Sequence, residues 1–113
     1  MAQRILVTGS AGFIGGYIVQ ELLDRGWEVV GIDNYSKYGK IAKSYDKHPR
    51  YHFVEGDAKN TGLMCELIAD CDHLLAGAAM IGGISYFHEF AYDLLAENER
   101  IIASTLDAAI GAF

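Results

Sequence analysis

Apolar and polar residues alternate along the chain in blocks that predict strands and helices in regular alternation. Short apolar runs predict β-strands at residues 4–7, 27–32, 51–55 and 73–79, the last of them buried. Helical spacing of apolar residues predicts α-helices from about residue 13 to residue 25, over residues 61–69, and from about residue 90 to residue 109. This alternation is typical of an α/β fold with a doubly wound parallel sheet, whose simplest strand order is 3-2-1-4.

Two regions carry more detail. Residues 34–50 are polar and contain Gly39 and Pro49, so we expect a loop with one short helix near residues 41–45.

The last predicted helix has an apolar stripe and an opposite polar face. The stripe comprises Leu94, Leu95, Ile101, Ile102, Leu106 and Ala109, and the polar face comprises Glu97, Arg100, Ser104 and Asp107. Asn98 falls within the stripe, where a buried amide is either a bracket to a neighbouring loop or part of a site.

The turn between the first strand and the first helix carries the clearest chemical signal. Gly9, Gly12 and Gly15 recur at every third position, which permits a sharp bend and close approach of a ligand to the backbone. The helix that follows directs unpaired N–H groups at the same place, and these suit a pyrophosphate. The alternative is a glycine-rich turn that binds nothing. Because Asp33 lies 18 residues after Gly15, the sequence favours a dinucleotide site.

Asp33 directly follows the second predicted strand, at its carboxyl end. A carboxylate there accepts hydrogen bonds from both hydroxyls of an adenosine ribose and repels a 2′-phosphate, which favours NAD over NADP. Lys37 and Lys40 follow closely and are able to host such a phosphate, so NADP stays open. The other interpretation of Asp33 is an acid that only caps the next loop.

Two further strand ends have both a functional and a plain structural interpretation. Gly56 and Asp57 are ordinary turn residues, yet in this fold they lie beside the first strand, where a carboxylate accepts from an adenine amino group. The fourth strand ends in the small residues 76–79. They leave room for a flat ligand, or they simply pack well.

Composition narrows the classes of partner. The net charge is −6 and all five lysines lie between residues 37 and 59, which argues against a nucleic-acid surface. No apolar run approaches the ~20 residues of a membrane span, and residues 1–20 do not resemble a signal peptide. Cys65 and Cys71 lack metal-ligand spacing. We therefore expect a cytoplasmic protein with two reduced thiols, no metal, no membrane contact and no nucleic-acid partner.

Five blocks in this order resemble the extended short-chain dehydrogenase/reductase family, which contains the NAD-dependent nucleotide-sugar epimerases and dehydratases. The blocks are residues 7–16, 31–34 and 53–57, the pair Ala78-Ala79, and Asn98. More narrowly, residues 78–84 followed by Asp93 and Asn98 are similar to GDP-fucose synthase and the GDP-mannose 3,5-epimerases. In one departure from the family, Ala76-Gly77 replaces a usually larger pair at the end of the fourth strand.

The resemblance implies a Rossmann-like sheet with NAD at its carboxyl edge. It implies that the backbone of Phe13 and Ile14 binds pyrophosphate within the turn formed by Gly9, Gly12 and Gly15, and that Asp33 and Asn34 hold the adenosine ribose. It also implies that Asp57 and Ala58 flank adenine, that Ala78 and Ala79 line the nicotinamide side, and that Asn98 braces the region behind the active site.

Family chemistry also needs a tyrosine with a lysine four residues later. None of the seven tyrosines has that partner, and no lysine follows Lys59, so we expect no catalytic residue in this chain. We expect residues 1–113 to be the N-terminal NAD-binding half of a Rossmann-type domain. The fifth strand, the catalytic segment and the substrate domain are then absent, and the chain alone is inactive.

The parent protein implied is a nucleotide-sugar epimerase, dehydratase or reductase that works by transient hydride transfer to NAD. Its expected partners are a nucleotide-sugar substrate and a second copy, in a homodimer through the helix around residues 94–109. The competing hypotheses are a non-enzymatic dinucleotide-binding or sensor module, and a scaffold remnant that binds no NAD.

Overall fold

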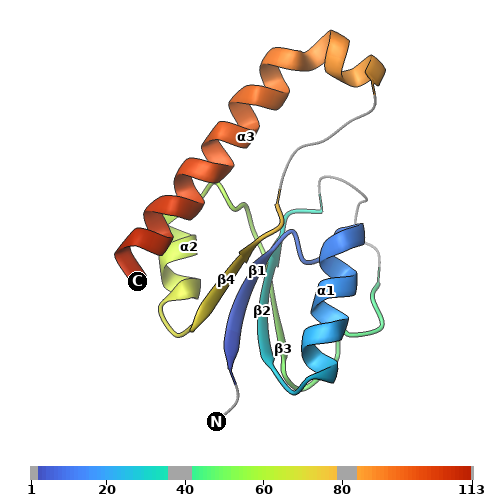
Figure 1. Cartoon of the computed structure of the whole chain (residues 1–113), viewed down its shortest axis with the longest axis vertical. Helices are drawn as coiled ribbons and strands as arrows, with labels where there is room; N and C mark the ends of the chain where they lie inside the picture. Colours follow the sequence, from blue (N-terminus) through green and yellow to red (C-terminus); the bar gives the residue numbers. More distant parts are fainter. Residues whose placement is uncertain (1–2, 36–41, 79–83, 113) are drawn as a thin grey trace.

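The computed structural model describes residues 3–35, 42–78 and 84–112, with the side chains of the last helix from residue 96 onward. The described residues form one parallel sheet with the order β3-β2-β1-β4 (Figure 1). Its strands are β1 Arg4–Thr8, β2 Glu28–Asp33, β3 Tyr51–Glu55 and β4 His73–Ala76. This confirms the predicted fold class and strand order.

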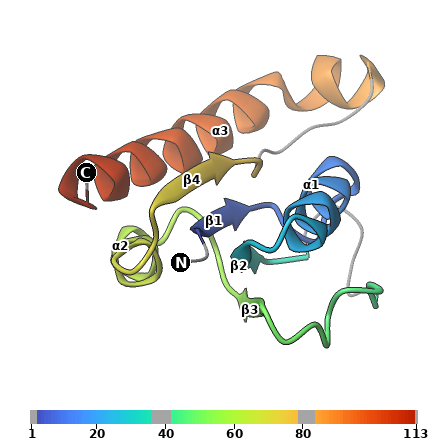
Figure 2. The same cartoon turned by 60° about the horizontal axis from the view of Figure 1, so that its bottom comes forward.

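Helices cover both faces of the sheet, as Figure 2 shows. Helix α1 spans Phe13–Asp24 and lies on one face, while α2 (Thr61–Ile68) and α3 (Ile84–Ala112) lie on the other. None of the helices in the described part of the chain is long and apolar enough to cross a membrane. The described residues also contain no group of three or more His, Cys, Asp or Glu side chains that could hold a metal ion.

Each face of the sheet has its own hydrophobic core, because successive side chains of a strand point to opposite faces. The core on the α1 side contains Ile5, Val7, Val19, Leu23, Val29, Tyr45 and Tyr51. The core on the α2 and α3 side contains Leu6, Val30, Ile32, Ala58, Met64, Ile68, Cys71 and Ala108. The chain thus forms three layers, and the carboxyl ends of the strands meet at one edge.

Helix α1 ends as the sequence predicts, but its buried face is not the one that the helical spacing of Ile14, Ile18 and Leu22 predicts. Gly26 follows the helix with a φ of +86°, the left-handed conformation that favours glycine. Gly15, Val19 and Leu23 are buried against the sheet, whereas Ile14 is 70% exposed. Gly15 is the inward residue at the start of α1 because the helix packs there against the backbone of Gly9 and Ser10, with no space for a side chain.

Strand β4 corrects one prediction. The strand ends at Ala76 rather than at Ala79, and His73 and Ala76 are exposed. Within the described sheet β4 pairs with β1 alone, so it is an edge strand rather than a buried one. Ala79 and the glycine pair at 82–83 lie outside the described residues.

The segment before β3 also differs from the prediction. Residues 44–47 form turns instead of a short helix, and Ile41 lies outside the described residues. The backbone N–H of Asp46 donates to Lys43 O at 3.2 Å, and that of His48 donates to Tyr45 O at 2.9 Å. His48 precedes Pro49, and a residue before proline disfavours helical backbone, which prevents a longer helix here.

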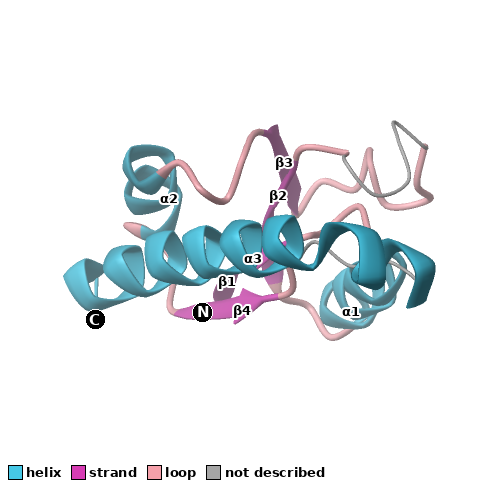
Figure 3. Ribbon diagram, turned by 90° about the horizontal axis from the view of Figure 1, so that it is seen from above, coloured by secondary structure: helices cyan, strands magenta, loops and turns pink. Residues whose placement is uncertain are grey.

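Helix α3 begins earlier than predicted and turns a different face inward. Ser104, Thr105 and Ala108 are buried, although Ser104 belonged to the expected polar face. Ile102 and Leu106, which belonged to the expected apolar stripe, are 57% and 54% exposed. Small side chains face inward because α3 lies close to α2, where Thr61 Oγ1 donates to Ser104 Oγ at 3.1 Å. Figure 3 shows α3 crossing above the sheet.

Candidate functional site

The turn between β1 and α1 is built by glycines at which a side chain would collide with backbone. Gly9 has a φ of +73°, and a Cβ atom placed on it would lie 2.7 Å from the carbonyl oxygen of Gly77. A Cβ atom on Gly15 would overlap the carbonyl oxygen of Gly9. The turn therefore packs tightly against both the end of β4 and the first turn of α1.

The N-terminus of α1 opens over this turn. Gly12 is the N-cap residue, in extended backbone conformation, and no side chain of the described residues caps this end of the helix. The first N–H groups of a helix have no partner within the helix, so those of Phe13 and Ile14 are available to an anion. The side chains of Phe13 and Ile14 are 64% and 70% exposed. The arrangement fits a pyrophosphate bound by backbone.

Asp33 lies at the same edge, at the carboxyl end of β2. Its Oδ2 accepts from the N–H of Ala11 at 2.9 Å, and its Oδ1 accepts from the N–H of Tyr35 at 2.7 Å. The carboxylate is therefore held directly beside the glycine turn and stays partly exposed. Asn34 follows it and is exposed. A carboxylate in this position can accept from the hydroxyls of a ribose bound beside the turn.

Asp57 follows β3 and belongs to a small charged cluster. Its Oδ1 accepts from the N–H of Lys59 at 2.9 Å, and Lys59 Nζ lies 3.6 Å from its Oδ2. Lys59 Nζ also donates to Glu97 Oε2 of α3 at 2.6 Å. This bond raises the pKa of Lys59 and lowers the pKa of Glu97. The cluster ties the loop that carries Asp57 to α3, one residue before the half-buried Asn98.

Ala58 and Ala78 are placed differently from each other. Ala58 is 7% exposed and packs in the core, so its side chain faces away from the solvent edge and its backbone alone remains for a ligand. Ala78 is half-buried beside the turn, where its N–H donates to Thr8 Oγ1 at 3.1 Å. Ala79 lies outside the described residues.

Thr8 is a site residue that the sequence analysis overlooked. It is fully buried, and its Oγ1 accepts from the N–H groups of both Gly77 and Ala78. A Cβ atom on Gly77 would lie 2.7 Å from the carbonyl oxygen of Thr8, which accounts for the small residue at this point. The position of Thr8, at the end of the first strand and directly before Gly9, could have identified it from the sequence.

Ser10 was overlooked as well. It is fully buried beneath the turn, where its carbonyl oxygen accepts from the hydroxyl of Tyr45 at 2.8 Å. Its Oγ accepts from the hydroxyl of Tyr51 at 3.0 Å. Burial raises the pKa of Tyr45 to about 12, and it also raises the pKa of Tyr51, so both hydroxyls keep their protons and donate. Nothing in the polar loop around Tyr45 signals this contact.

Comparisons with known proteins agree with this geometry. Residues 5–111 match the sequence model of the NAD dependent epimerase/dehydratase family. The chain belongs to this family. Among curated relatives, it is 36% identical over 117 residues to the low-salt glycan biosynthesis protein Agl12 of Haloferax volcanii, covering 96% of this chain and 36% of the relative.

Solved structures of family members show the same fold. The dTDP-glucose 4,6-dehydratase DesIV of Streptomyces venezuelae, with NAD and TYD bound, is 30% identical with a TM-score of 0.87. The match covers 97% of this chain and 36% of that structure. The enzyme WbmH of Bordetella bronchiseptica, in complex with NAD+, is 30% identical with a TM-score of 0.77, over 96% of this chain and 36% of that one. The chain thus spans about a third of the length of these proteins.

Proposed function

We propose that this family member is the NAD(H)-binding portion of a nucleotide-sugar epimerase or dehydratase. One observation carries the proposal: the glycine turn, the open N-terminus of α1 and the Asp33 carboxylate converge at the carboxyl edge of the sheet. Relatives at 30% identity that contain NAD support the same cofactor class.

Each part of the cofactor has candidate residues here. The backbone of Phe13 and Ile14 would hold the pyrophosphate, and Asp33 with Asn34 would hold the adenosine ribose. The adenine would lie beside Asp57 and the backbone of Ala58. Ala78 and Ala79 would line the nicotinamide side, with Asn98 behind it. When bound, NAD supplies reversible hydride transfer.

The proposal also covers the substrate and the part of the reaction that residues 1–113 serve. A nucleotide-sugar substrate is supported by the dTDP-glucose 4,6-dehydratase among the relatives. None of the tyrosines in the sequence has a lysine four residues later, so residues 1–113 hold the cofactor without supplying the acid–base pair of the reaction. The cytoplasmic location and the narrower resemblance to GDP-fucose synthase stay predictions.

We also propose a homodimer contact on α3. Ile102, Leu106 and Ile110 recur at four-residue spacing on this helix and are 57%, 54% and 77% exposed. A contiguous apolar face of this kind is typical of a protein–protein contact. If a second copy contacts the protein through its own α3, the apolar faces of both helices are buried at once.

The first prediction concerns cofactor choice. Because the Asp33 carboxylate faces the ribose position, the protein should bind NAD more tightly than NADP by about 1–3 kcal/mol, which is roughly 5- to 150-fold in Kd. Asp33→Asn removes the charge at nearly constant shape and should narrow that ratio. Calorimetric titration of both cofactors against both proteins measures it.

Asp107→Asn is the matched control, because it removes one exposed carboxylate near the C-terminal end of α3. It should leave the ratio of the two dissociation constants unchanged. Equal affinities for NAD and NADP in the unmodified protein, or a preference for NADP, would contradict the assignment of Asp33.

A further inference from the structure

A single peptide unit in the glycine turn is held at both ends. The carbonyl oxygen of Ser10 accepts from the hydroxyl of Tyr45 at 2.8 Å. The N–H of Ala11, which belongs to the same planar peptide unit, donates to Asp33 Oδ2 at 2.9 Å. Since the unit is rigid, a rotation that broke one of these bonds would also disturb the other. Tyr45 and Asp33 are thereby coupled through the turn.

The space beneath the turn leaves Tyr45 little freedom. Tyr45 is 4% exposed, and its ring meets that of Tyr51 edge-on with centroids 5.0 Å apart. A Cβ atom on Gly16 would lie 3.1 Å from the Tyr45 hydroxyl oxygen, and one on Gly31 would lie 2.5 Å from that of Tyr51. Because Gly16 and Gly31 have no side chains, the phenol rings of Tyr45 and Tyr51 fit against their backbone and fill the space.

The segment that carries Tyr45 is fastened to α1. Ser44 Oγ donates to Gln20 Oε1 at 3.2 Å, near the middle of the helix. At the far end, Arg50 Nη2 donates to Leu23 O at 2.7 Å, and Arg50 Nε donates to Trp27 O at 3.4 Å. These bonds hold the Tyr45 hydroxyl against the turn from below, so its direction does not depend on the ring packing alone.

We propose that Tyr45 is a positioning residue that sets the direction of the Asp33 carboxylate and thereby the preference for an unphosphorylated ribose over a 2′-phosphate. This rests on the proposed function, in which Asp33 faces the adenosine ribose. With the Ser10 carbonyl released, the peptide unit gains freedom and Asp33 Oδ2 loses its fixed donor, so the N–H of Tyr35 on Oδ1 is left to orient the carboxylate. The carboxylate then holds ribose hydroxyls less well and faces a 2′-phosphate less directly.

The test compares two variants that each remove one buried phenol hydroxyl. Tyr45→Phe removes the bond to the Ser10 carbonyl, while Tyr51→Phe removes the bond to the Ser10 side chain and leaves the peptide unit held. Dissociation constants for NAD and for NADP are measured by calorimetry on each variant and on the unmodified protein. Urea unfolding of all three measures their stability.

For Tyr45→Phe we expect the Kd for NAD to rise about fivefold, in keeping with the loss of one hydrogen bond, while the Kd for NADP changes less than twofold. Tyr51→Phe should lower the free energy of unfolding about as much as Tyr45→Phe does, since each variant loses one buried hydrogen bond. It should leave the ratio of the Kd for NADP to the Kd for NAD unchanged within twofold. A purely structural role for Tyr45 would shift stability alone, or would shift both constants together, and either result overturns the inference.

Gly16→Ala provides a second route that keeps both tyrosines. Its methyl group presses on the Tyr45 hydroxyl, so the NAD-to-NADP ratio should fall in the same direction as for Tyr45→Phe. An unchanged ratio in a folded Gly16→Ala protein counts against the coupling. Failure of the proposed function is distinguishable, because the unmodified protein would then show no preference for NAD before any substitution.

Discussion

At the scale of single residues, the three turn glycines are needed for different physical reasons. Gly9 has a positive φ, which other residues adopt only at a cost. Gly15 has no space for a side chain, because a Cβ atom would overlap the carbonyl oxygen of Gly9. Gly12 has an ordinary φ of −79°, and its Cβ position is only tight, at 3.2 Å from the same oxygen. A side chain at Gly12 is therefore expected to obstruct the proposed phosphate site above the turn rather than the fold.

This difference predicts opposite phenotypes for two similar substitutions. Gly12→Ala should fold with nearly unchanged stability but lose most of its affinity for NAD, because the methyl group stands where the pyrophosphate approaches. Gly15→Ala should lose about 1–3 kcal/mol or more of stability, because α1 must move away from the turn. Thermal unfolding and NAD titration of both variants check this.

The two variants serve as controls for each other, since each adds one methyl group and the two positions are three residues apart. Normal NAD binding by a folded Gly12→Ala protein would mean that the phosphate lies elsewhere. A Gly15→Ala protein as stable as the unmodified one would contradict the packing argument.

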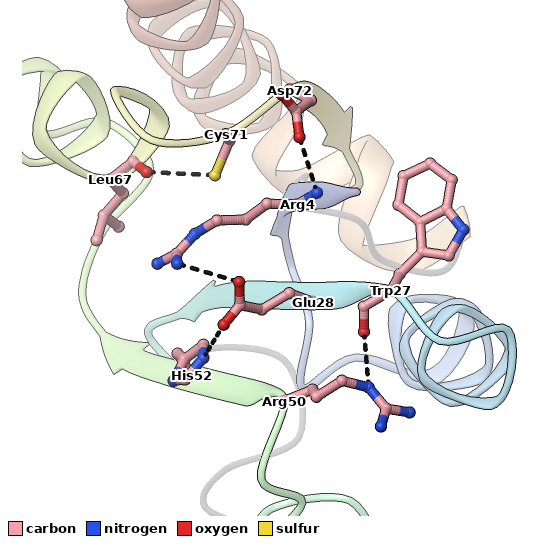
Figure 4. Close-up of polar contacts among 8 residues, drawn as sticks. All are labelled: Arg4, Trp27, Glu28, Arg50, His52, Leu67, Cys71 and Asp72. Carbon is pink, nitrogen blue, oxygen red and sulfur yellow. Dashed lines mark hydrogen bonds and ion pairs between the residues drawn. The ribbon is translucent and has the colours of Figure 1, made fainter. Parts of the chain in front are cut away.

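At the scale of elements, the amino ends of three strands are linked by charged side chains (Figure 4). Arg4 of β1 contacts Glu28 of β2 at 3.3 Å, and His52 Nε2 of β3 lies 2.9 Å from the other oxygen of Glu28. The hydrogen bond with His52 and the nearby charge of Arg4 lower the pKa of Glu28. This edge is opposite the candidate site, so its contacts serve the order of the strands and not the ligand.

The lowered pKa of Glu28 predicts the direction in which stability changes with pH. A carboxylate whose pKa is lowered by folding stabilises the protein above its ordinary pKa of 4.5, and that contribution is lost as the pH falls below this value. Glu28→Gln should therefore be less stable than the unmodified protein near pH 7. The two proteins should converge as the pH falls toward 3. Urea unfolding between pH 3 and pH 7 follows the difference.

Glu66→Gln is the matched control, because Glu66 is an exposed carboxylate of α2. Its stability curve should run parallel to that of the unmodified protein over the whole range. Parallel curves for Glu28→Gln as well would show that the contacts of Glu28 with Arg4 and His52 contribute nothing to acid sensitivity.

At the scale of the whole molecule, the two faces of α3 differ in how far their side chains are buried. The inner face of α3 is filled by the small residues Ser104, Thr105 and Ala108 against α2. Its outer face carries the exposed residues Ile102, Leu106 and Ile110. Burying an aliphatic side chain is worth about 1.5–3 kcal/mol, so a contact that covers this face from two copies has a large driving force.

We therefore predict self-association through the outer face of α3. Sedimentation of the protein should show dimers or larger species that dissociate on dilution. Leu106→Ser with Ile110→Ser should shift the protein to monomers without loss of thermal stability, because neither side chain contributes to the core. A protein that stays monomeric before any substitution, at about 100 μM, would refute the contact.

Sequence alone determined the features that depend on residues close together in the chain. Apolar runs placed all four strands, with β3 at its observed bounds and the others within a few residues, apart from the C-terminal end of β4. Alternation with helices determined the order β3-β2-β1-β4. The glycine spacing placed the turn, and Asp33 stands at the end of β2 as expected. Backbone conformation and hydrophobic period are local properties, so a sequence expresses them directly.

Tertiary structure alone decided which surfaces those elements share. Helical spacing could not tell that Val19 and Leu23, rather than Ile14, face the sheet, because that depends on how α1 packs against the turn and the sheet. The same holds for the inner face of α3 and the exposure of β4 as an edge. Tyr45 and Ser10 are 35 residues apart, and no local pattern relates them. They meet because the chain returns beneath the turn before it enters β3, and only the packed fold brings a phenol hydroxyl to that carbonyl oxygen.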